Sequence, residues 1–278
     1  MATSDSDTPT SPHRGAPLDP TAFNILTALK QTDSACPICR LVQKGVVSYL
    51  DAISYESVND PDTRHQIRKA FGYCAAHGQE WLRLQDTLGT ALIYRDVLNH
   101  ALDIMQTHIA PPSDTHPTPT TPTEGSLRNK VQRLFGGNTG DTAPARALAA
   151  DLAPTAPCPA CLYTLTLEAD MLQAFVNALS HNSFMAAYRL NQTGLCLPHL
   201  RQALPRITNP HHLRVLIQAQ EMKLASTLAN LSEVIRKFDY RNTAEQRGNE
   251  FQVPARSVEQ ASGSLPTQLN LPATNPRP

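Results

Sequence analysis

The sequence predicts an all-α protein made of two tandem helical repeats. Apolar residues recur every three or four positions within two blocks, and no stretch alternates apolar with polar residues as a strand would. One pattern of cysteines and histidines occurs twice at a constant offset, which is typical of an internal duplication. We therefore expect a pseudo-symmetric helical bundle in which each repeat holds one Cys₃His metal site.

The prolines separate the two blocks from their surroundings. Of the 23 prolines, 15 lie in three segments that are also rich in Thr, Ser, Asn and Gln, namely 1–20, 111–145 and 242–278. Such segments bury too little apolar surface to offset the conformational entropy lost on ordering, so we expect a disordered N-terminus, linker and tail. The predicted repeats are 21–110 and 146–241.

The overall composition argues against several classes of protein. Lys plus Arg and Asp plus Glu number 24 each, so no global positive field favours nucleic acid. Six cysteines in 278 residues are too few for a disulfide scaffold, and no apolar run is long enough for a transmembrane helix. The N-terminus lacks the pattern of a secretory signal. We expect a cytoplasmic protein with no membrane association.

The residue pattern of the first repeat predicts three helical elements. A helix begins at Pro37, because proline suits the first helical position and apolar residues follow at helical spacing. Asp60 and Pro61 are the cap and first turn of a shorter helix that ends near Gly72. A long helix over 84–109 then carries a near-heptad apolar stripe, interrupted at Arg95.

The second repeat predicts the same succession. A helix follows Pro159, and a shorter one, capped by Asn182 or Ser183, ends near Gly194. A long helix with an apolar stripe over 213–238, interrupted near Gln220, closes the repeat. We expect both stripes to be core seams through which the two halves pack.

All six cysteines belong to the duplicated pattern. CPxC followed by G-x-C-x-x-H occurs in both repeats, and each residue of the first copy has its counterpart 122 positions later. The eight candidate metal ligands are Cys36, Cys39, Cys74, His77, Cys158, Cys161, Cys196 and His199.

The spacing suits a closed metal site. Residues i and i+3 at a helix start share one face, so each CxxC and each CxxH presents two ligand atoms to one point. The 34 residues between Cys39 and Cys74 suffice for a helix out and a shorter helix back, so we expect both pairs of one repeat to meet. Trp81, four positions after His77, is expected to pack over this site.

Zinc is the metal that this donor set favours, with two ions per chain and structural rather than catalytic roles, because four protein ligands leave no open position. An iron–sulfur cluster could use the same residues. A dithiol–disulfide pair and unliganded buried cysteines are further alternatives.

These motifs resemble those of a bacterial family of unknown function whose members carry CPxC and G-[FLY]-C-x-x-H in two halves. Its "RKxDYR" stretch is similar to Arg236-Lys237-Phe238-Asp239-Tyr240-Arg241 here. The resemblance implies a helical protein with metal-binding cysteines and supplies no catalytic residue. Some members are labelled as substrate-binding proteins of ABC transporters, but this chain lacks the two-lobed α/β pattern that such a role requires.

No nucleophile–base pair is visible, so we expect no catalytic residues. The sequence favours an intracellular scaffold or adaptor that binds a protein partner. The alternative is a redox- or metal-responsive regulator whose zinc–thiolate sites open on oxidation. An enzyme with a cleft between the repeats is the third hypothesis.

Overall fold

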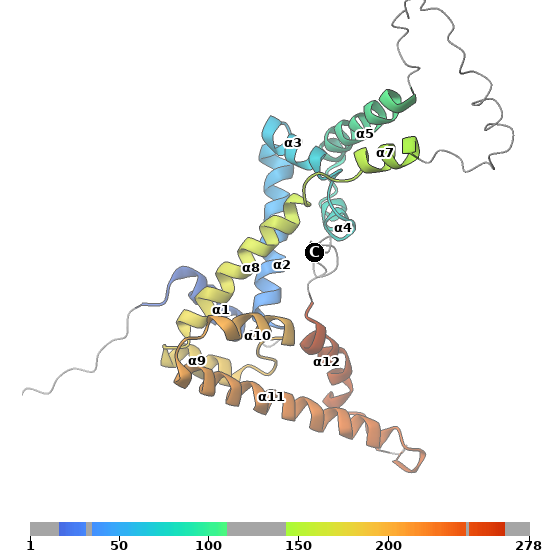
Figure 1. The fold of residues 1–278 in the computed structure, drawn as a ribbon. Helices are drawn as coiled ribbons and strands as arrows, with labels where there is room; N and C mark the ends of the chain where they lie inside the picture. The colour runs from blue at the N-terminus through green and yellow to red at the C-terminus, as the bar shows by residue number, and fades with distance from the viewer. Residues whose placement is uncertain (1–16, 32–34, 110–142, 243–244, 265–278) are drawn as a thin grey trace, which may run out of the picture. The chain divides into compact units, whose positions relative to one another are not determined.

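The computed structural model describes residues 17–31, 35–109, 143–242 and 245–264 (Figure 1). Every regular element in these ranges is a helix and none is a strand, which confirms the predicted fold class. The chain forms two compact units that do not follow the repeats. Of the described residues, unit 1 comprises those within 17–48 and 163–264, and unit 2 comprises 49–109 and 143–162.

Unit 1 combines the start of the first repeat with most of the second. Its core lies around Phe175, whose ring meets those of Phe184 and Tyr188 edge-on at centroid distances of 5.4 and 5.5 Å. The elements are α1 (Pro20–Leu29), the first part of α2 (Pro37–Ala52), most of α8 (Pro159–Ala178), α9 (Asn182–Leu190), α10 (Leu197–Ala203), η2 (Leu204–Arg206), α11 (Pro210–Lys237), η3 (Tyr240–Asn242), η4 (Asn249–Gln252) and α12 (Val253–Ser262).

Unit 2 contains the rest of the first repeat and the start of the second. Its buried side chains include Leu50, Ile67, Trp81, Ile93 and Val97. The elements are the end of α2, the π-helical turn η1 (Ile53–Ser57), α3 (Pro61–Lys69), α4 (Ala75–Arg83), α5 (Thr87–Ile109), α7 (Ala143–Asp151) and the first turn of α8.

The helix starts follow the predicted capping chemistry in most places. Helices begin at Pro37, Pro61 and Pro159, and the Asp60 carboxylate accepts the Thr63 N–H at 2.7 Å. The expected cap at Asn182 or Ser183 is wrong. Helix α9 begins one residue earlier, after His181, whose side chain makes no capping hydrogen bond.

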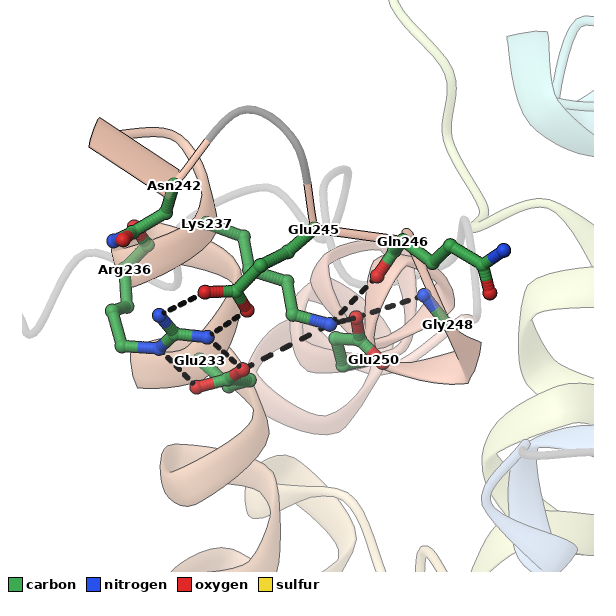
Figure 2. A network of polar contacts seen from close by, with 8 residues as sticks. All are labelled: Glu233, Arg236, Lys237, Asn242, Glu245, Gln246, Gly248 and Glu250. Carbon is green, nitrogen blue, oxygen red and sulfur yellow. Dashed lines mark hydrogen bonds and ion pairs between the residues drawn. The ribbon is translucent and has the colours of Figure 1, made fainter. Parts of the chain in front are cut away.

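The prediction that residues 242–278 are disordered is wrong for part of this range, because residues 249–262 are helical. Figure 2 shows how the chain folds back on the end of α11. Arg236 donates to Glu233 at 2.7 Å and to Glu245 at 2.9 Å, and Lys237 reaches Glu250 at 2.7 Å. The segment thus brings α12 against α11 within unit 1, and Val253 is buried there.

The other segments expected to be disordered lie largely outside the described residues. This applies to 1–16, 111–142 and 265–278. The last three residues of the predicted linker, 143–145, already belong to α7.

The expectation that the apolar stripes of the long helices form the core is wrong. On α5, Leu88, Leu98 and Leu102 are exposed, while Ile93 and Val97 are buried. On α11 the exposed members include Ile217, Leu228 and Ile235, whereas the buried positions are Leu216, Ala219, Gln220, Lys223 and Val234.

Among the described residues, no helix combines the length and hydropathy that crossing a bilayer requires.

Candidate metal centres

The eight predicted ligands come together in two groups of four. Centre 1 consists of Cys36, Cys39, Cys196 and His199, and centre 2 consists of Cys74, His77, Cys158 and Cys161. In each group the ligand atoms all lie within 4.8 Å of one another. Three thiols and one imidazole form a donor set that could hold a metal ion.

The predicted pairing within each repeat is wrong, because each CxxC meets the CxxH of the other repeat. The reason is the length of α2. Its 16 residues carry the chain about 24 Å from Cys36 and Cys39, at a rise of about 1.5 Å per residue. Helix α3 has nine residues and spans only about 13 Å, and the tight turn at Phe71 and Gly72, both at positive φ, adds little length before Cys74.

Centre 1 is built by two helix starts. Cys36 and Cys39 flank the first turn of α2, while Cys196 is the N-cap of α10 and His199 lies in its first turn. The Sγ atoms of Cys39 and Cys196 are 3.7 Å apart. His199 Nδ1 lies 3.1 Å from Cys196 Sγ, 3.4 Å from Cys39 Sγ and 3.5 Å from Cys36 Sγ, so Nδ1 is the nitrogen that this histidine offers to a metal.

The turn before Cys196 is fixed by buried polar side chains. Gly194 adopts φ +67°, and an added Cβ would lie 2.5 Å from Gln220 Oε1. Asn191 Oδ1 accepts the Gly194 N–H at 2.7 Å. The Gln220 side chain accepts from Leu195 N–H and donates to the Leu195 carbonyl at 3.2 and 2.9 Å. The polar interruption of the α11 stripe is therefore a clamp on the backbone that carries Cys196.

Glu168 supports the histidine of centre 1 from α8. Its Oε1 lies 2.7 Å from His199 Nε2, as an ion-pair contact whose N–H is not aligned for a hydrogen bond, and it accepts from Gln202 at 2.9 Å. A carboxylate behind a ligating imidazole fixes the ring orientation and strengthens the ligand. Burial raises the pKa of Glu168, but the contact with His199 outweighs it and leaves that pKa below its ordinary value. Sequence spacing gave no signal for this residue.

The described C-terminal end also reaches centre 1. The Ser264 N–H points to Cys39 Sγ at 3.5 Å. A main-chain N–H beside a thiolate stabilises its negative charge. The segment expected to be disordered therefore contributes to the surroundings of a metal ligand.

Centre 2 repeats the construction with α8 and α4. Cys158 and Cys161 stand at the start of α8, Cys74 is the N-cap of α4, and His77 lies in its first turn. His77 Nδ1 is 3.3 Å from Cys74 Sγ, 3.4 Å from Cys161 Sγ and 3.7 Å from Cys158 Sγ. The Sγ atoms of Cys74 and Cys161 lie 3.6 Å apart.

Tyr73 and Trp81 form an aromatic pair beside the segment that carries Cys74. Trp81 is almost completely buried, stacks on Tyr73 at 5.3 Å and donates to Thr90 Oγ1 at 2.9 Å. Because Tyr73 directly precedes Cys74, the pair fixes the segment that carries this ligand. Gly72, with φ +96°, makes the turn before it, as Gly194 does in centre 1.

The two centres differ in exposure. Cys36, Cys39, Cys196 and His199 are all buried. In centre 2, Cys74 and Cys161 are only half-buried. Oxidants and chelators therefore meet more accessible sulfur atoms in centre 2.

Without metal, hydrogen bonds within each centre shift the pKa values of some of its ligand residues. Hydrogen bonding to Cys161 lowers the pKa of Cys158 to about 4, and hydrogen bonding to Cys196 places the pKa of Cys39 well below its ordinary value. Burial lowers the pKa of His199, but its hydrogen bonds to Cys196 and Cys39 outweigh burial and raise that pKa to about 11. In each centre the hydrogen bonds thus favour the thiolate form of one cysteine, the form that binds a metal.

The sequence matches a known protein family over most of its length. The model of a family of unknown function (DUF6062) matches residues 22–268, which include all eight candidate ligands, and this match confirms the resemblance drawn from the motifs. An uncharacterised 23.9 kDa protein in the xynA 3' region of Caldicellulosiruptor sp. (strain Rt8B.4) is 24% identical over 215 residues, covering 76% of this chain and 85% of that protein. No solved structure matches the chain.

Proposed function

The chain belongs to the DUF6062 family of unknown function, and we propose that it is a zinc-stapled helical scaffold that binds a protein partner. The observation that carries this proposal is the crossed arrangement of eight ligands in two closed groups of four. A catalytic zinc needs an open position for water or substrate, and four protein ligands leave none. The two metal ions then act as cross-links.

The spacing of the sulfur atoms favours a single zinc ion in each centre. A tetrahedral ion with Zn–S bonds of about 2.3 Å holds its sulfur ligands about 3.8 Å apart. The Cys39–Cys196 and Cys74–Cys161 distances are 3.7 and 3.6 Å. An iron–sulfur cluster places several iron and sulfide atoms between its cysteine ligands and needs wider separations.

The crossed pairing makes the metal a determinant of the fold. Zinc in centre 1 would tie the start of α2 to the start of α10, and zinc in centre 2 would tie the start of α4 to the start of α8. Zinc binding in small folded peptides contributes about 10–16 kcal/mol at neutral pH. That contribution is comparable to the whole stability of an ordinary domain.

The exposed face of the long helix α11 favours binding to a protein partner. Leu228 and Ile235 on α11 are 64% and 73% exposed, and they lie one heptad apart. A run of exposed aliphatic side chains at heptad spacing is typical of a surface that packs against another helix. We infer that the scaffold presents this face.

Two measurements test the proposal. Elemental analysis of protein purified without added metal should find two zinc ions per chain, and iron or no metal would refute the zinc assignment. Replacing Leu228 and Ile235 by Asp should abolish co-purification of the partner, whereas Val258→Asp, at an equally exposed valine of α12, should not. Equal effects of both changes would contradict a specific face on α11.

A second function is favoured by the half-buried thiols of centre 2. Hydrogen peroxide could oxidise Cys74 and Cys161 to a disulfide, with the two thiolates giving up two electrons and peroxide plus two protons becoming two water molecules. One zinc ion would leave, and the chain would act as a redox-responsive regulator. Reversible loss of one zinc per chain under mild peroxide supports this function, while retention of both supports the scaffold alone.

A further inference from the structure

Unit 1 contains a cavity of about 410 Å³ whose lining includes none of the eight candidate metal ligands. It lies between the C-terminal end of α9, the middle of α11 and the start of α12, elements that belong to one compact unit. Three cationic side chains line it, namely Arg189, Lys223 and Arg256, and no carboxylate does. In a chain of zero formal net charge, this is a local concentration of positive charge.

The positive charges are not neutralised by neighbouring side chains. None of the ion pairs among the described residues includes any of the three cations. Arg256 Nη1 donates to Gln192 Oε1 at 3.0 Å, but its Nε is buried without a hydrogen-bond partner. The charge of Arg256 therefore has no carboxylate opposite it among the described ion pairs.

Lys223 is the most buried of the three cations, with 6% of its surface exposed. Its ammonium donates only to main-chain carbonyls, those of Arg189 at 3.2 Å and of Asn191. Burial lowers the pKa of Lys223 to about 8, as expected where no carboxylate compensates the charge. An anion in the cavity would compensate it.

We propose that this cavity binds a small organic anion through a phosphate or carboxylate group. Arg256, Lys223 and Arg189 all line the cavity, and their side chains supply the positive charge and the hydrogen-bond donors for that group. Thr227 and Asn230 line the polar part of the cavity, and Met222 and Val253 line its apolar part. Such a mixture suits a ligand with a charged head and a short carbon body.

Calorimetric titration of the metal-loaded full chain with inorganic phosphate and, separately, with succinate tests the proposal. We expect one saturable site per chain for at least one of the two anions. Arg256→Gln and Arg189→Gln should each weaken binding about tenfold or more, because each removes a charged hydrogen-bond donor. Arg214→Gln, at an exposed arginine of α11 outside the cavity, should leave binding unchanged.

The two anions distinguish the chemistry of the ligand head. Binding of phosphate alone assigns a phosphate group to the ligand head, and binding of succinate alone assigns a carboxylate. No saturable binding of either anion, or binding that Arg214→Gln weakens as much as Arg256→Gln does, would overturn the proposal. Circular dichroism and metal content show whether each variant is folded, and exposed Arg189 provides a second variant if Arg256→Gln disturbs α12.

Discussion

The Sγ atoms of Cys39 and Cys196 lie 3.7 Å apart although 157 positions separate these residues in the chain. The contact joins the CxxC of one repeat to the CxxH of the other. A duplicated chain whose repeats each closed their own site would behave as two independent small domains. The crossed pairing instead makes both centres depend on both repeats, so loss of either metal should affect segments far apart in the sequence.

Replacing Glu168 by Gln should weaken metal binding at centre 1 about 10- to 100-fold, because removal of a partner that orients a ligating histidine has effects of this size. Centre 2 should keep its affinity, since the His77 site does not use this carboxylate. Competition with a chromogenic zinc chelator measures both affinities. Glu221→Gln, at an exposed residue of α11, is the control, and a similar loss in that variant would show that the effect is not specific.

Replacing Gly194 by Ala should destabilise unit 1. A residue with a Cβ pays about 1–2 kcal/mol for the left-handed conformation, and the new methyl group would press on Gln220 and Tyr188. The midpoint of urea unfolding of the metal-loaded chain measures the change. Gly78→Ala is the matched control, because its nearest neighbours lie 3.9 Å away and Ala is favoured over Gly inside a helix. Equal midpoints for the two variants would contradict the role assigned to Gly194.

Ending the chain after Asn242 should leave both metals bound but accelerate zinc release from centre 1. This truncation removes α12 and the Ser264 N–H that lies beside Cys39. Ending the chain after Ser264 keeps these contacts and should leave the release rate unchanged. Zinc transfer to a fluorescent chelator gives the rates. Identical kinetics for the two truncated chains would show that the C-terminal segment does not protect the centre.

The sequence predicted what local chemistry determines. Helix starts at Pro37, Pro61 and Pro159 follow from backbone preferences, and the eight ligands follow from residue types at i and i+3. The pairing of the ligands could not be predicted, because it depends on how far α2 carries the chain before α3 turns back.

Three further features escaped the sequence for different physical reasons. Glu168 acts through His199, and such a contact has no characteristic spacing. Helix α12 buries few side chains, among them Val253 and Gln260, so its composition resembles a disordered tail. The heptad stripe of α11 was expected in the core, but it is the neighbouring face, with Leu216 and the polar clamp Gln220, that is buried.

Alkylation mapping of the zinc-loaded Cys74→Ser variant in the presence of a mild chelator tests the crossed pairing most directly. Loss of this ligand should release the metal from centre 2 alone, so zinc content should fall from two ions to one. Mass spectrometry of the peptides should then find Cys158 and Cys161 alkylated, with Cys36 and Cys39 protected. Alkylation of Cys36 and Cys39, with Cys158 and Cys161 protected, would show that each repeat closes its own site and would contradict the account.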